Sequence, residues 1–320
     1  MSSLSLTSPR TGLRRWWRNI KALVSVPDVV AELRALNSRI DLLNSRIDLL
    51  DYHSHGARAV YVGNNRVLMK AVVANALIAF FLEADDRLLT PWFIVSGRYE
   101  TELTDFFLKN LKPDSYCIDI GANFGYYTCL MSRFCPSGRV IAVEADEHVY
   151  ELARDNIFIN GFEHIAQAIH GAASDSGEWL TLYRRLSRSA NTSLAKMSDD
   201  FVAQLGELPS QPFEVKGIRI DDLLPRLNHH VDFIKIDVEG AEPLAFRGAR
   251  ETIERNPRLT IVMEWSPHQI SGAGFDPGEF LSELESMHLQ PFNTEGKALS
   301  RDELLATSYF AGIVLRRSWS

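Results

Sequence analysis

The sequence predicts an α/β domain, in which helices cover both faces of a mostly parallel sheet, preceded by an N-terminal coiled-coil helix. Two observations predict this organisation. From about residue 56, apolar runs of strand length alternate with amphipathic stretches of helical length, which is typical of such a sheet. Before residue 56, apolar side chains recur at alternating spacings of three and four, as in a coiled coil. A chain of 320 residues is long enough for both parts.

The first 25 residues form a basic segment. They contain five basic side chains and no acidic one, although the whole chain has a formal net charge of −7. Within them, "GLRRWWRNIKALV" places Trp16, Ile20 and Leu23 at helical spacing among arginines. A basic helix with tryptophans is typical of peripheral contact with an anionic membrane surface, which we expect through residues 10–24. A disordered basic tail is the alternative.

Residues 26–55 are predicted to form the coiled-coil helix. The heptad "LNSRIDL" occurs twice in tandem from residue 36. Isoleucine at position a and leucine at position d favour a parallel two-stranded coiled coil, so we expect a homo-oligomer that assembles through residues 26–50. Leu42 and Leu49 widen the apolar stripe, and a single amphipathic helix packed on its own domain is therefore the alternative.

A lead-in α/β segment, residues 56–112, is predicted next. "ARAVYVG" and "NALIAFFLE" are rich in residues that strands favour. In "TPWFIVSG", Thr90 is expected to cap a short helix, with Pro91 in its first turn and Gly97 at its end. The stretch "ETELTDFFLKNLK" predicts an amphipathic helix that leads into the main domain.

The main domain, residues 113–320, is predicted to alternate strands with helices. One helix ends near residue 135 and another runs from about 147 to 160. The strands are expected at residues 116–120, 139–145, 165–172, 178–183, 231–237, 258–265 and 308–317.

The composition excludes several classes of protein. A net charge of −7 argues against a nucleic-acid-binding protein, whose surface is normally basic, so no nucleic-acid partner is expected. The three cysteines match neither a disulfide framework nor a metal-binding spacing, which indicates free thiols in a reducing compartment. No apolar run reaches the about 20 residues of a membrane-spanning helix. We therefore expect a cytoplasmic protein that is peripheral at the inner membrane surface where its basic N-terminus binds.

The residues that follow the first two strands of the main domain suit a nucleoside ligand. "DIGANFGYYT" holds Asp119, Gly121, Asn123 and Gly125, and its glycines let the backbone approach a ligand closely. The third glycine of the dinucleotide fingerprint is missing, which disfavours a pyrophosphate. Glu144, at the end of the second strand, is placed to accept hydrogen bonds from both hydroxyls of a ribose. Together these features indicate a nucleoside cofactor without a pyrophosphate, and S-adenosylmethionine fits that description.

These motifs resemble those of the FkbM family of S-adenosylmethionine-dependent methyltransferases. The resemblance rests on "IDIGANFGYYT", "AVEAD", "NIFIN" and above all "FIKIDVEGAE", and it covers roughly residues 58–270. It implies a class I methyltransferase fold with a seven-stranded sheet and S-adenosyl-L-methionine as cofactor. The residues assigned to this cofactor are Asp119, Gly121, Asn123, Gly125, Glu144 and Ala173. The resemblance implies that the first four hold the methionine end and that Glu144 holds the ribose.

The charged end of "VDFIKIDVEGAE" is the predicted centre of the chemistry. Strand alternation puts Phe233, Lys235 and Asp237 on one face of the sheet. Asp237 then lies at the carboxyl end of the strand, where a carboxylate can bind an acceptor hydroxyl and take its proton. Lys235 is expected to pair with Asp237 or with Glu264, and such a pair would orient the acid.

Further side chains are candidates for the same chemistry. Glu239 is the second candidate base, with orientation of its loop as the alternative role. Glu242 is expected at a helix N-terminus, where negative charge is stabilised. His268, just beyond a strand end, is a third candidate base, although a lone loop histidine is more often a surface residue. Asp237, Glu239 and Glu264 could supply oxygen ligands, but no spacing demands a metal and none is predicted.

The resemblance implies methyl transfer to a hydroxyl of a sugar, a glycan or a related natural product, and hence a small-molecule or glycan partner. The arginines of "YRRLSRSANTSL" are expected either to bind an acidic group of this substrate or to lie in a solvated loop. Two other functions stay open. Lys235, Asp237 and Glu264 are similar to part of the catalytic set of RNA ribose methyltransferases. A non-catalytic coiled-coil scaffold in glycan assembly is the other alternative.

Overall fold

The computed structural model describes residues 31–40, 58–185, 192–195 and 209–317, and the chain forms two compact units, Met1–Ala57 and Arg58–Ser320. In the first unit, residues 31–40 form a helix on which Leu36 and Ile40 are exposed. This agrees with the prediction of a helix there, while the basic segment and the remainder of the predicted coiled-coil segment lie outside the described residues. No helix in the described ranges combines the length and the apolar character that a membrane-spanning segment needs.

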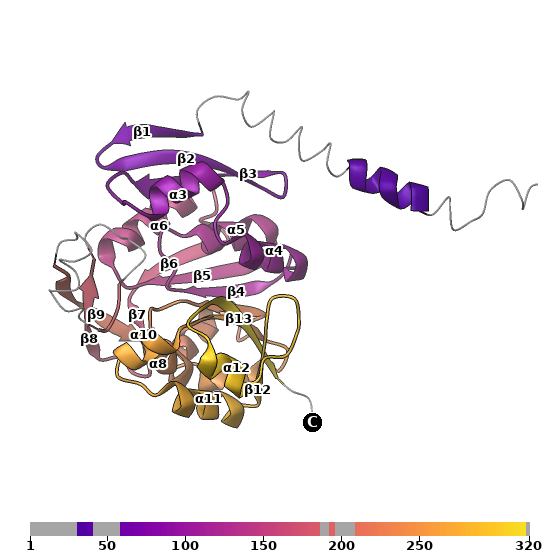
Figure 1. The fold of residues 1–320 in the computed structure, drawn as a ribbon. Helices are drawn as coiled ribbons and strands as arrows, with labels where there is room; N and C mark the ends of the chain where they lie inside the picture. The colour runs from indigo at the N-terminus through magenta and orange to yellow at the C-terminus, as the bar shows by residue number, and fades with distance from the viewer. Residues whose placement is uncertain (1–30, 41–57, 186–191, 196–208, 318–320) are drawn as a thin grey trace, which may run out of the picture. The chain divides into compact units, whose positions relative to one another are not determined.

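A seven-stranded sheet forms the centre of the second unit (Figure 1). In spatial order its strands are β12 (Leu289–Phe292), β13 (Phe310–Arg317), β11 (Thr260–Trp265), β10 (Phe233–Ile236), β4 (Tyr116–Ile120), β5 (Arg139–Glu144) and β6 (Ala166–His170). All neighbours are parallel except β13, which is antiparallel to β11 and β12. The prediction of a mostly parallel seven-stranded sheet is therefore confirmed.

The membership of this sheet differs from the prediction at one strand. The stretch predicted at 178–183 forms β8 (Trp179–Arg184), which pairs with β9 (Gln211–Ile218) in a separate small sheet that also contains β7 (Ala172–Ala173). The seventh strand of the central sheet is instead β12, at the edge beside β13. That strand was not predicted because its four residues, "LQPF", include a proline and are too short to show alternation.

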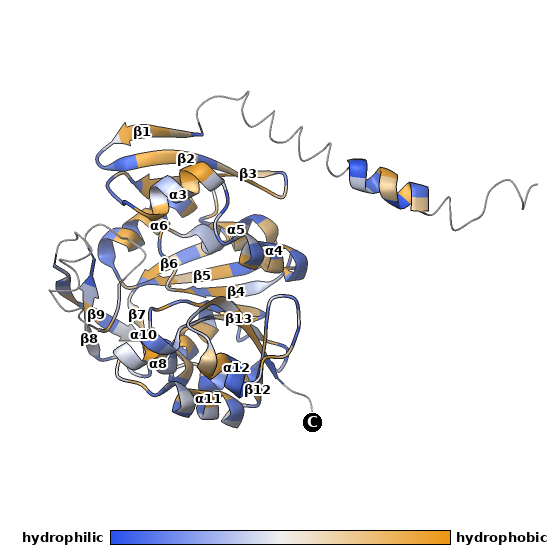
Figure 2. Ribbon diagram, in the orientation of Figure 1, coloured by the Kyte–Doolittle hydropathy of each residue, from blue (hydrophilic) through white to orange (hydrophobic). Residues whose placement is uncertain are grey.

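Helices cover both faces of the central sheet, as predicted. On one face lie α4 (Thr101–Asn110), α5 (Tyr126–Phe134) and α6 (Glu147–Ile159). On the other lie η1 (Ile220–Leu227), α8 (Glu242–Arg247), α9 (Arg250–Arg255), α10 (Pro267–Gly272), α11 (Pro277–Ser286) and α12 (Arg301–Ala306). Each face buries its own apolar cluster, and β5, in the interior of the sheet, is largely orange in Figure 2.

The alternation predicted for β10 is confirmed. Ile234 and Ile236 belong to one apolar cluster, whereas Phe233 belongs to the cluster on the opposite face. The Lys235 Nζ atom lies on the Phe233 side, 5.1 Å from the centre of the Tyr127 ring. The strand is thus held by its apolar residues on both faces, and its polar side chains are directed to the face that carries α4 and α5.

The lead-in segment forms a three-stranded antiparallel sheet and a short helix. Its elements are β1 (Ala59–Gly63), β2 (Arg66–Val73), β3 (Ala76–Glu83) and α3 (Leu89–Ser96). The strand β2 was not predicted, because both hairpin turns are made without glycine at their centres. Asn64 and Asn65 have positive φ, as do Ala74 and Asn75, and such paired left-handed residues form the turns that match strand twist.

The helix α3 begins two residues earlier than predicted, and its first N–H groups bond to a different side chain. The N-cap residue is Leu88, and the Asp86 Oδ1 atom accepts hydrogen bonds from the N–H groups of Leu88 and Leu89 at 2.9 and 2.6 Å, so Asp86, not Thr90, satisfies the start of the helix. The Thr90 hydroxyl instead donates to the Glu83 carbonyl. Gly97 ends the helix with a φ of +70°, as its sequence position predicts.

Two asparagines, Asn156 in α6 and Asn160 at its C-cap, join the lead-in sheet to the main domain. The Asn156 amide accepts from the Phe81 N–H group at 2.6 Å and donates to the Phe81 and Phe124 carbonyls at 2.9 and 2.7 Å. Asn160, one helical turn later, exchanges the same pair of bonds with Ala79 at 2.9 and 2.7 Å. The two amides thus act as an additional strand on the edge of β3, and lead-in and main domain form one compact unit.

We expect Asn156→Ala to lower the free energy of unfolding by about 3 kcal/mol, because it leaves three backbone groups without partners, two of them on the β3 edge. Asn156 is fully buried, whereas Asn160 is half-buried and water can replace its bonds. The matched variant Asn160→Ala should therefore cost about 1 kcal/mol. Urea denaturation of both variants measures the difference, and equal losses would contradict this account of the edge.

Candidate active site

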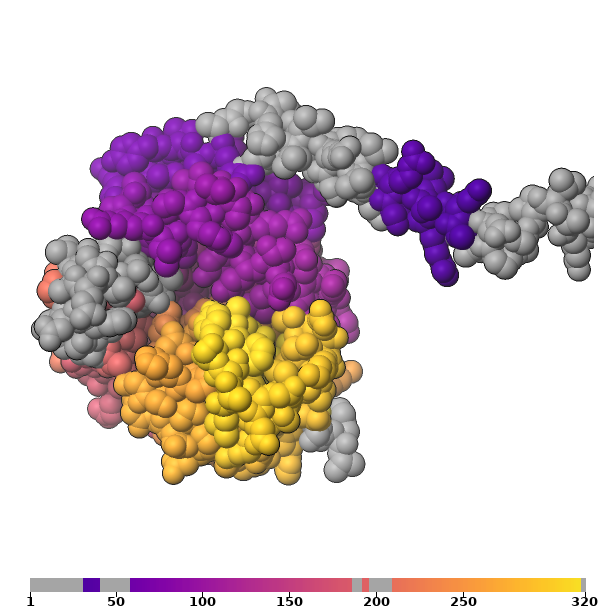
Figure 3. All heavy atoms as spheres, in the orientation of Figure 1, coloured from indigo at the N-terminus to yellow at the C-terminus, as the bar shows by residue number. Residues whose placement is uncertain are grey.

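A cavity of about 320 Å³ opens at the carboxyl ends of the central parallel strands. Its wall includes residues that follow β4, β5 and β10, together with Glu264 near the end of β11. The chain passes from β4 to β5 on one side and reaches β10 on the other, so the cavity lies where the strand order reverses, the usual ligand site of such sheets. In Figure 3, the magenta and yellow parts of the second unit meet on one face.

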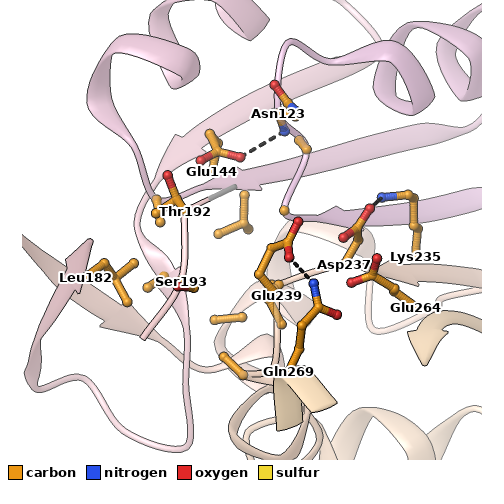
Figure 4. A pocket seen from close by; sticks show the side chains of 18 of the residues that line it. Asn123, Glu144, Leu182, Thr192, Ser193, Lys235, Asp237, Glu239, Glu264 and Gln269 are labelled. Carbon is orange, nitrogen blue, oxygen red and sulfur yellow. Dashed lines mark hydrogen bonds and ion pairs between the residues drawn. The ribbon is translucent and has the colours of Figure 1, made fainter. Parts of the chain in front are cut away.

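The loop after β4 packs its backbone directly against the end of β10. Gly121 has a φ of +69°, and a Cβ atom at this position would lie 1.7 Å from the Asp237 carbonyl oxygen. Only glycine therefore allows this approach. The next residues lead into the cavity wall, where the Asn123 N–H group donates to Glu144 Oε2 at 2.8 Å (Figure 4). The loop and the end of β5 are thus fixed to each other.

Glu144 is buried at the end of β5 and lines the cavity. Its Oε1 atom accepts from the Asp146 N–H group at 2.9 Å, while Oε2 accepts from Asn123. Each carboxylate oxygen has a further lone pair for a ligand hydroxyl. Burial raises the pKa of Glu144 to about 7, and the hydrogen bonds from the two backbone N–H groups only partly oppose it.

The raised pKa of Glu144 makes stability depend on pH. Because the pKa of an exposed glutamate is near 4.5 and that of Glu144 is about 7, the folded protein loses stability as the pH rises from about 4.5 through 7. Relative to Glu144→Gln, wild-type protein should lose about 2 to 3 kcal/mol between pH 5 and pH 8. Chemical denaturation at several pH values measures this, and a pH-independent difference between the two proteins would refute it.

The structure does not bring all predicted cofactor residues into the cavity. Gly121, Asn123, Glu144 and Ala173 line it, but Asp119 and Gly125 do not. Gly125 has a φ of +83° and precedes α5, where a Cβ atom would lie 3.3 Å from the Cβ of Ala153 in α6. Its position serves the packing of two helices. Sequence spacing alone does not distinguish this glycine from Gly121.

Asp119 lies behind the cavity wall. It is fully buried on β4, opposite Lys235 on β10, and accepts a hydrogen bond from the Thr128 hydroxyl at 2.6 Å. Burial raises the pKa of Asp119, and the charge of Lys235 opposes this rise. Asp119 therefore interacts electrostatically with the neighbouring Lys235, which lines the cavity, and does not line the cavity itself.

Lys235 pairs with Asp237, one of the two partners predicted for it. The Nζ atom donates to Asp237 Oδ2 at 3.0 Å. Burial lowers the pKa of Lys235, but the charges of Asp237, Asp119 and Glu100 raise it by more, so the ammonium group stays charged. The Asp237 side chain is 25% exposed and lines the cavity. The pair thus presents an oriented carboxylate to a ligand.

Glu239 and Glu242 have different places in the loop after β10. Glu239 lines the cavity and accepts a hydrogen bond from the Gln269 side-chain amide (Figure 4). Glu242 is buried at the start of α8, where its Oε1 atom accepts from the N–H groups of Val238 and Gly240, both at 3.3 Å. Burial raises the pKa of Glu242 to about 7. Glu242 therefore shapes the loop, and Glu239 faces the cavity.

The histidines lie apart from this centre. His268 is exposed at the start of α10 and does not line the cavity, because the neighbouring Gln269 points there instead. His170 is exposed as well, with its Nε2 atom 3.0 Å from the Ala145 carbonyl oxygen. Arg184 binds Asp146, which is buried, so its guanidinium group holds β8 to the loop after β5. The alternative in which Arg184 binds an acidic substrate is therefore not supported.

Several cavity residues were missed by the sequence analysis. They come from segments far from the glycine loop, and they are Leu88, Tyr99, Glu100, Gln269 and Tyr309. The Tyr127 hydroxyl donates to Glu100 Oε2 at 2.8 Å, and burial raises the pKa of Glu100 to about 7. Glu100 also has a φ of +41°, but nothing in the sequence marks it. Only the topology shows that these side chains converge.

The fold and the cavity define a class I methyltransferase, a seven-stranded sheet whose first two strand ends hold a glycine loop and an acidic residue. The chain belongs to the FkbM methyltransferase family. The family model described as "Methyltransferase FkbM domain" matches residues 119–289, which contain the glycine loop, Glu144 and the charged end of β10. S-adenosyl-L-methionine is the cofactor, and the backbone approach at Gly121 and the buried carboxylate of Glu144 fit it.

The individual relatives have low sequence identity to this chain. The methyltransferase sdnD of Sordaria araneosa is 24% identical over 195 residues, which cover 54% of this chain and 75% of the relative. The FkbM methyltransferase structure from Methylobacillus flagellatus aligns with a TM-score of 0.40 and 15% identity, over 64% of this chain and 44% of that one. The O-methyltransferase from Bacillus cereus in complex with SAH aligns with a TM-score of 0.37 and 14% identity, over 73% and 90% of the two chains.

Proposed function

We propose that this methyltransferase transfers a methyl group to a hydroxyl of a sugar, a glycan or a related natural product. The observation that carries the proposal is the Lys235–Asp237 pair, which presents an oriented carboxylate inside the cavity at the carboxyl end of β10. A hydroxyl is a weak acid, and its methylation needs a nearby group that takes the proton as the oxygen attacks. The position of Asp237 in the cavity wall supports this role.

The chain's residues have distinct tasks in this reaction. S-adenosyl-L-methionine supplies an electrophilic methyl group on its sulfonium sulfur. The backbone at Gly121 and the Glu144 carboxylate position the donor, while Asp237 binds the acceptor hydroxyl. As the oxygen–carbon bond forms and the carbon–sulfur bond breaks, the hydroxyl proton passes to Asp237 and then to solvent. Lys235 keeps Asp237 oriented until that moment.

The side chains around Asp237 support an acceptor with several hydroxyl groups. Glu100, Glu239 and Glu264 line the same part of the cavity, and carboxylates accept strong hydrogen bonds from hydroxyl groups. The rings of Tyr99 and Tyr309 also line it and offer apolar surface. Among the described residues of this wall, Lys235 is the only lysine. An acidic wall of this kind disfavours the phosphates of RNA, so we do not favour ribose methylation of RNA.

Methyl transfer from labelled S-adenosyl-L-methionine tests the proposal. Purified full-length protein is incubated with sugars, glycans and polyhydroxylated natural products, and with RNA as the alternative acceptor, and the products are analysed by mass spectrometry. We expect a methyl ether on a non-nucleic-acid acceptor. Methylation confined to RNA ribose, or to nitrogen, would overturn the proposal. A protein that does not bind S-adenosyl-L-methionine in calorimetry would instead be the non-catalytic scaffold.

A further inference from the structure

Three carboxylates converge at one point of the cavity. They belong to Asp237 and Glu239, in the loop after β10, and to Glu264, near the end of the adjacent strand β11. One oxygen of each lies within 4.8 Å of the others, and Figure 4 shows the three side chains directed toward one another. Like charges repel at such distances, so this arrangement needs a positive partner or protons to be stable.

Glu264 gives a second, independent indication of a ligand. Its side chain is 7% exposed, and its Oε2 atom is buried without a hydrogen-bond partner, although the Tyr309 hydroxyl interacts with the same carboxyl group. A buried carboxylate oxygen without a partner costs free energy, so this arrangement points to a bound group that supplies the missing partner. Gln269 carries another buried oxygen without a partner, Oε1, beside Glu239.

The loop after β10 is built to direct Glu239 into this cluster. Glu239 has a φ of +51° and Gly240 a φ of +99°. A Cβ atom on Gly240 would lie 2.4 Å from the Gln269 carbonyl oxygen, so the loop is packed tightly against α10. The two N–H groups bonded to Glu242 fix the same loop from the other side. A non-glycine residue in the left-handed region costs free energy, and such strain is typical of ligand sites.

The described part of the cavity wall contains little positive charge to balance these acids. Its acidic side chains are Glu100, Glu144, Asp237, Glu239 and Glu264, and its basic side chain is Lys235. The Lys235 ammonium group bonds to Asp237 Oδ2 and also lies over the Tyr127 ring. One lysine cannot neutralise the three carboxylates of the cluster, whereas one lysine together with a divalent cation would.

We propose that Asp237, Glu239 and Glu264 bind a divalent cation that prefers oxygen ligands, namely Mg²⁺, Mn²⁺ or Ca²⁺. An all-oxygen ligand set with three carboxylates matches the preference of these hard cations. The sequence predicted no metal, because two ligands are separated by one residue and the third lies on another strand. Only the parallel pairing of β10 with β11 brings them together.

The role of the cation rests on the proposed function. Bound at this point, it contacts the acceptor hydroxyl next to Asp237 and lowers the pKa of that hydroxyl, because a positive charge stabilises the developing alkoxide. The proton then passes to Asp237, the oxygen–carbon bond forms, and the sulfonium becomes a neutral sulfide. The cation is not consumed.

Binding of Mn²⁺ to the full-length protein tests the site without any acceptor. Titration followed by electron paramagnetic resonance should show one saturable site in wild-type protein, with Mg²⁺ and Ca²⁺ as competitors. Glu264→Gln should weaken Mn²⁺ binding at least about tenfold, since a ligand charge is lost. Glu100→Gln is the matched control, because it makes the same substitution in the same cavity outside the cluster, and it should change the affinity less than about threefold.

Three results would overturn the cation site. The first is the absence of saturable Mn²⁺ binding in wild-type protein that binds S-adenosyl-L-methionine in calorimetry. The second is an equal loss in Glu264→Gln and Glu100→Gln, which would show a diffuse charge effect. The third is unchanged binding in Glu264→Gln. Cofactor binding by each variant shows that it is folded. Because no acceptor is used, failure of the cation site leaves the proposed hydroxyl methylation to its own assay.

Discussion

Asp237→Asn is expected to lower kcat at least about 100-fold while the affinity for S-adenosyl-L-methionine changes less than about threefold. Asparagine has nearly the same shape and still accepts a hydrogen bond from Lys235 Nζ, which lies 3.0 Å from Oδ2 in the wild-type protein. It cannot take the proton of an acceptor hydroxyl. Steady-state kinetics with the identified acceptor, together with calorimetry for the cofactor, measures both quantities.

Asp232→Asn is the control for this experiment. Asp232 lies just before the same strand, at its amino end, where its Oδ2 atom accepts from the Tyr116 N–H group at 2.9 Å and does not line the cavity. Its kcat should stay within about twofold of wild type. If Asp237→Asn kept wild-type turnover, the assignment of Asp237 as base would be wrong. The Mn²⁺ affinity of Asp237→Asn shows how much of its loss in kcat comes from the loss of a cation ligand.

Gly121→Ala is expected to destabilise the fold by at least about 3 kcal/mol and to weaken cofactor binding more than tenfold. The added Cβ atom would lie 1.7 Å from the Asp237 carbonyl oxygen, so either the glycine loop or the end of β10 must move. Both belong to the cavity wall, and the shift would therefore reach the cofactor and the predicted base together. Denaturation measures the stability, and calorimetry measures the cofactor affinity.

Gly161→Ala is the control that distinguishes the steric clash at position 121 from the strain of a positive φ. Gly161 has a φ of +70°, almost the same as the +69° of Gly121, but a Cβ atom there meets nothing within 4 Å. Its replacement should cost about 1 kcal/mol and leave cofactor affinity unchanged. If the two variants were equally stable, close backbone approach would not be what requires glycine at position 121.

The elements that could be predicted from the sequence are those whose apolar pattern lies within their own residues. The strands β4, β5 and β11 have long apolar runs, and β10 shows its two faces in four residues, so their places and the position of Asp237 after β10 followed from periodicity. The strand β2 escaped prediction because its turns use asparagine and alanine in place of glycine. A turn of that kind leaves only a weak signal in the residues themselves.

The candidate site was predictable only in part, for a physical reason. Gly121 and Asp237 directly follow strands and Glu144 is the last residue of one, so each is placed by its own strand. Glu100 and Tyr309 reach the cavity from segments about two hundred residues apart, through packing that no local pattern records. Gly125 fits the same motif as Gly121, but its lack of a side chain serves contact between α5 and α6.

The asparagine pair on α6 also determines how the lead-in sheet can meet other chains. An exposed sheet edge offers unpaired N–H and C=O groups to any extended peptide and is a common origin of aggregation. On β3, the amides of Asn156 and Asn160 already occupy the backbone groups of Phe81 and Ala79. That edge is closed to strand addition, and a strand from another molecule that extends this sheet must pair with β1.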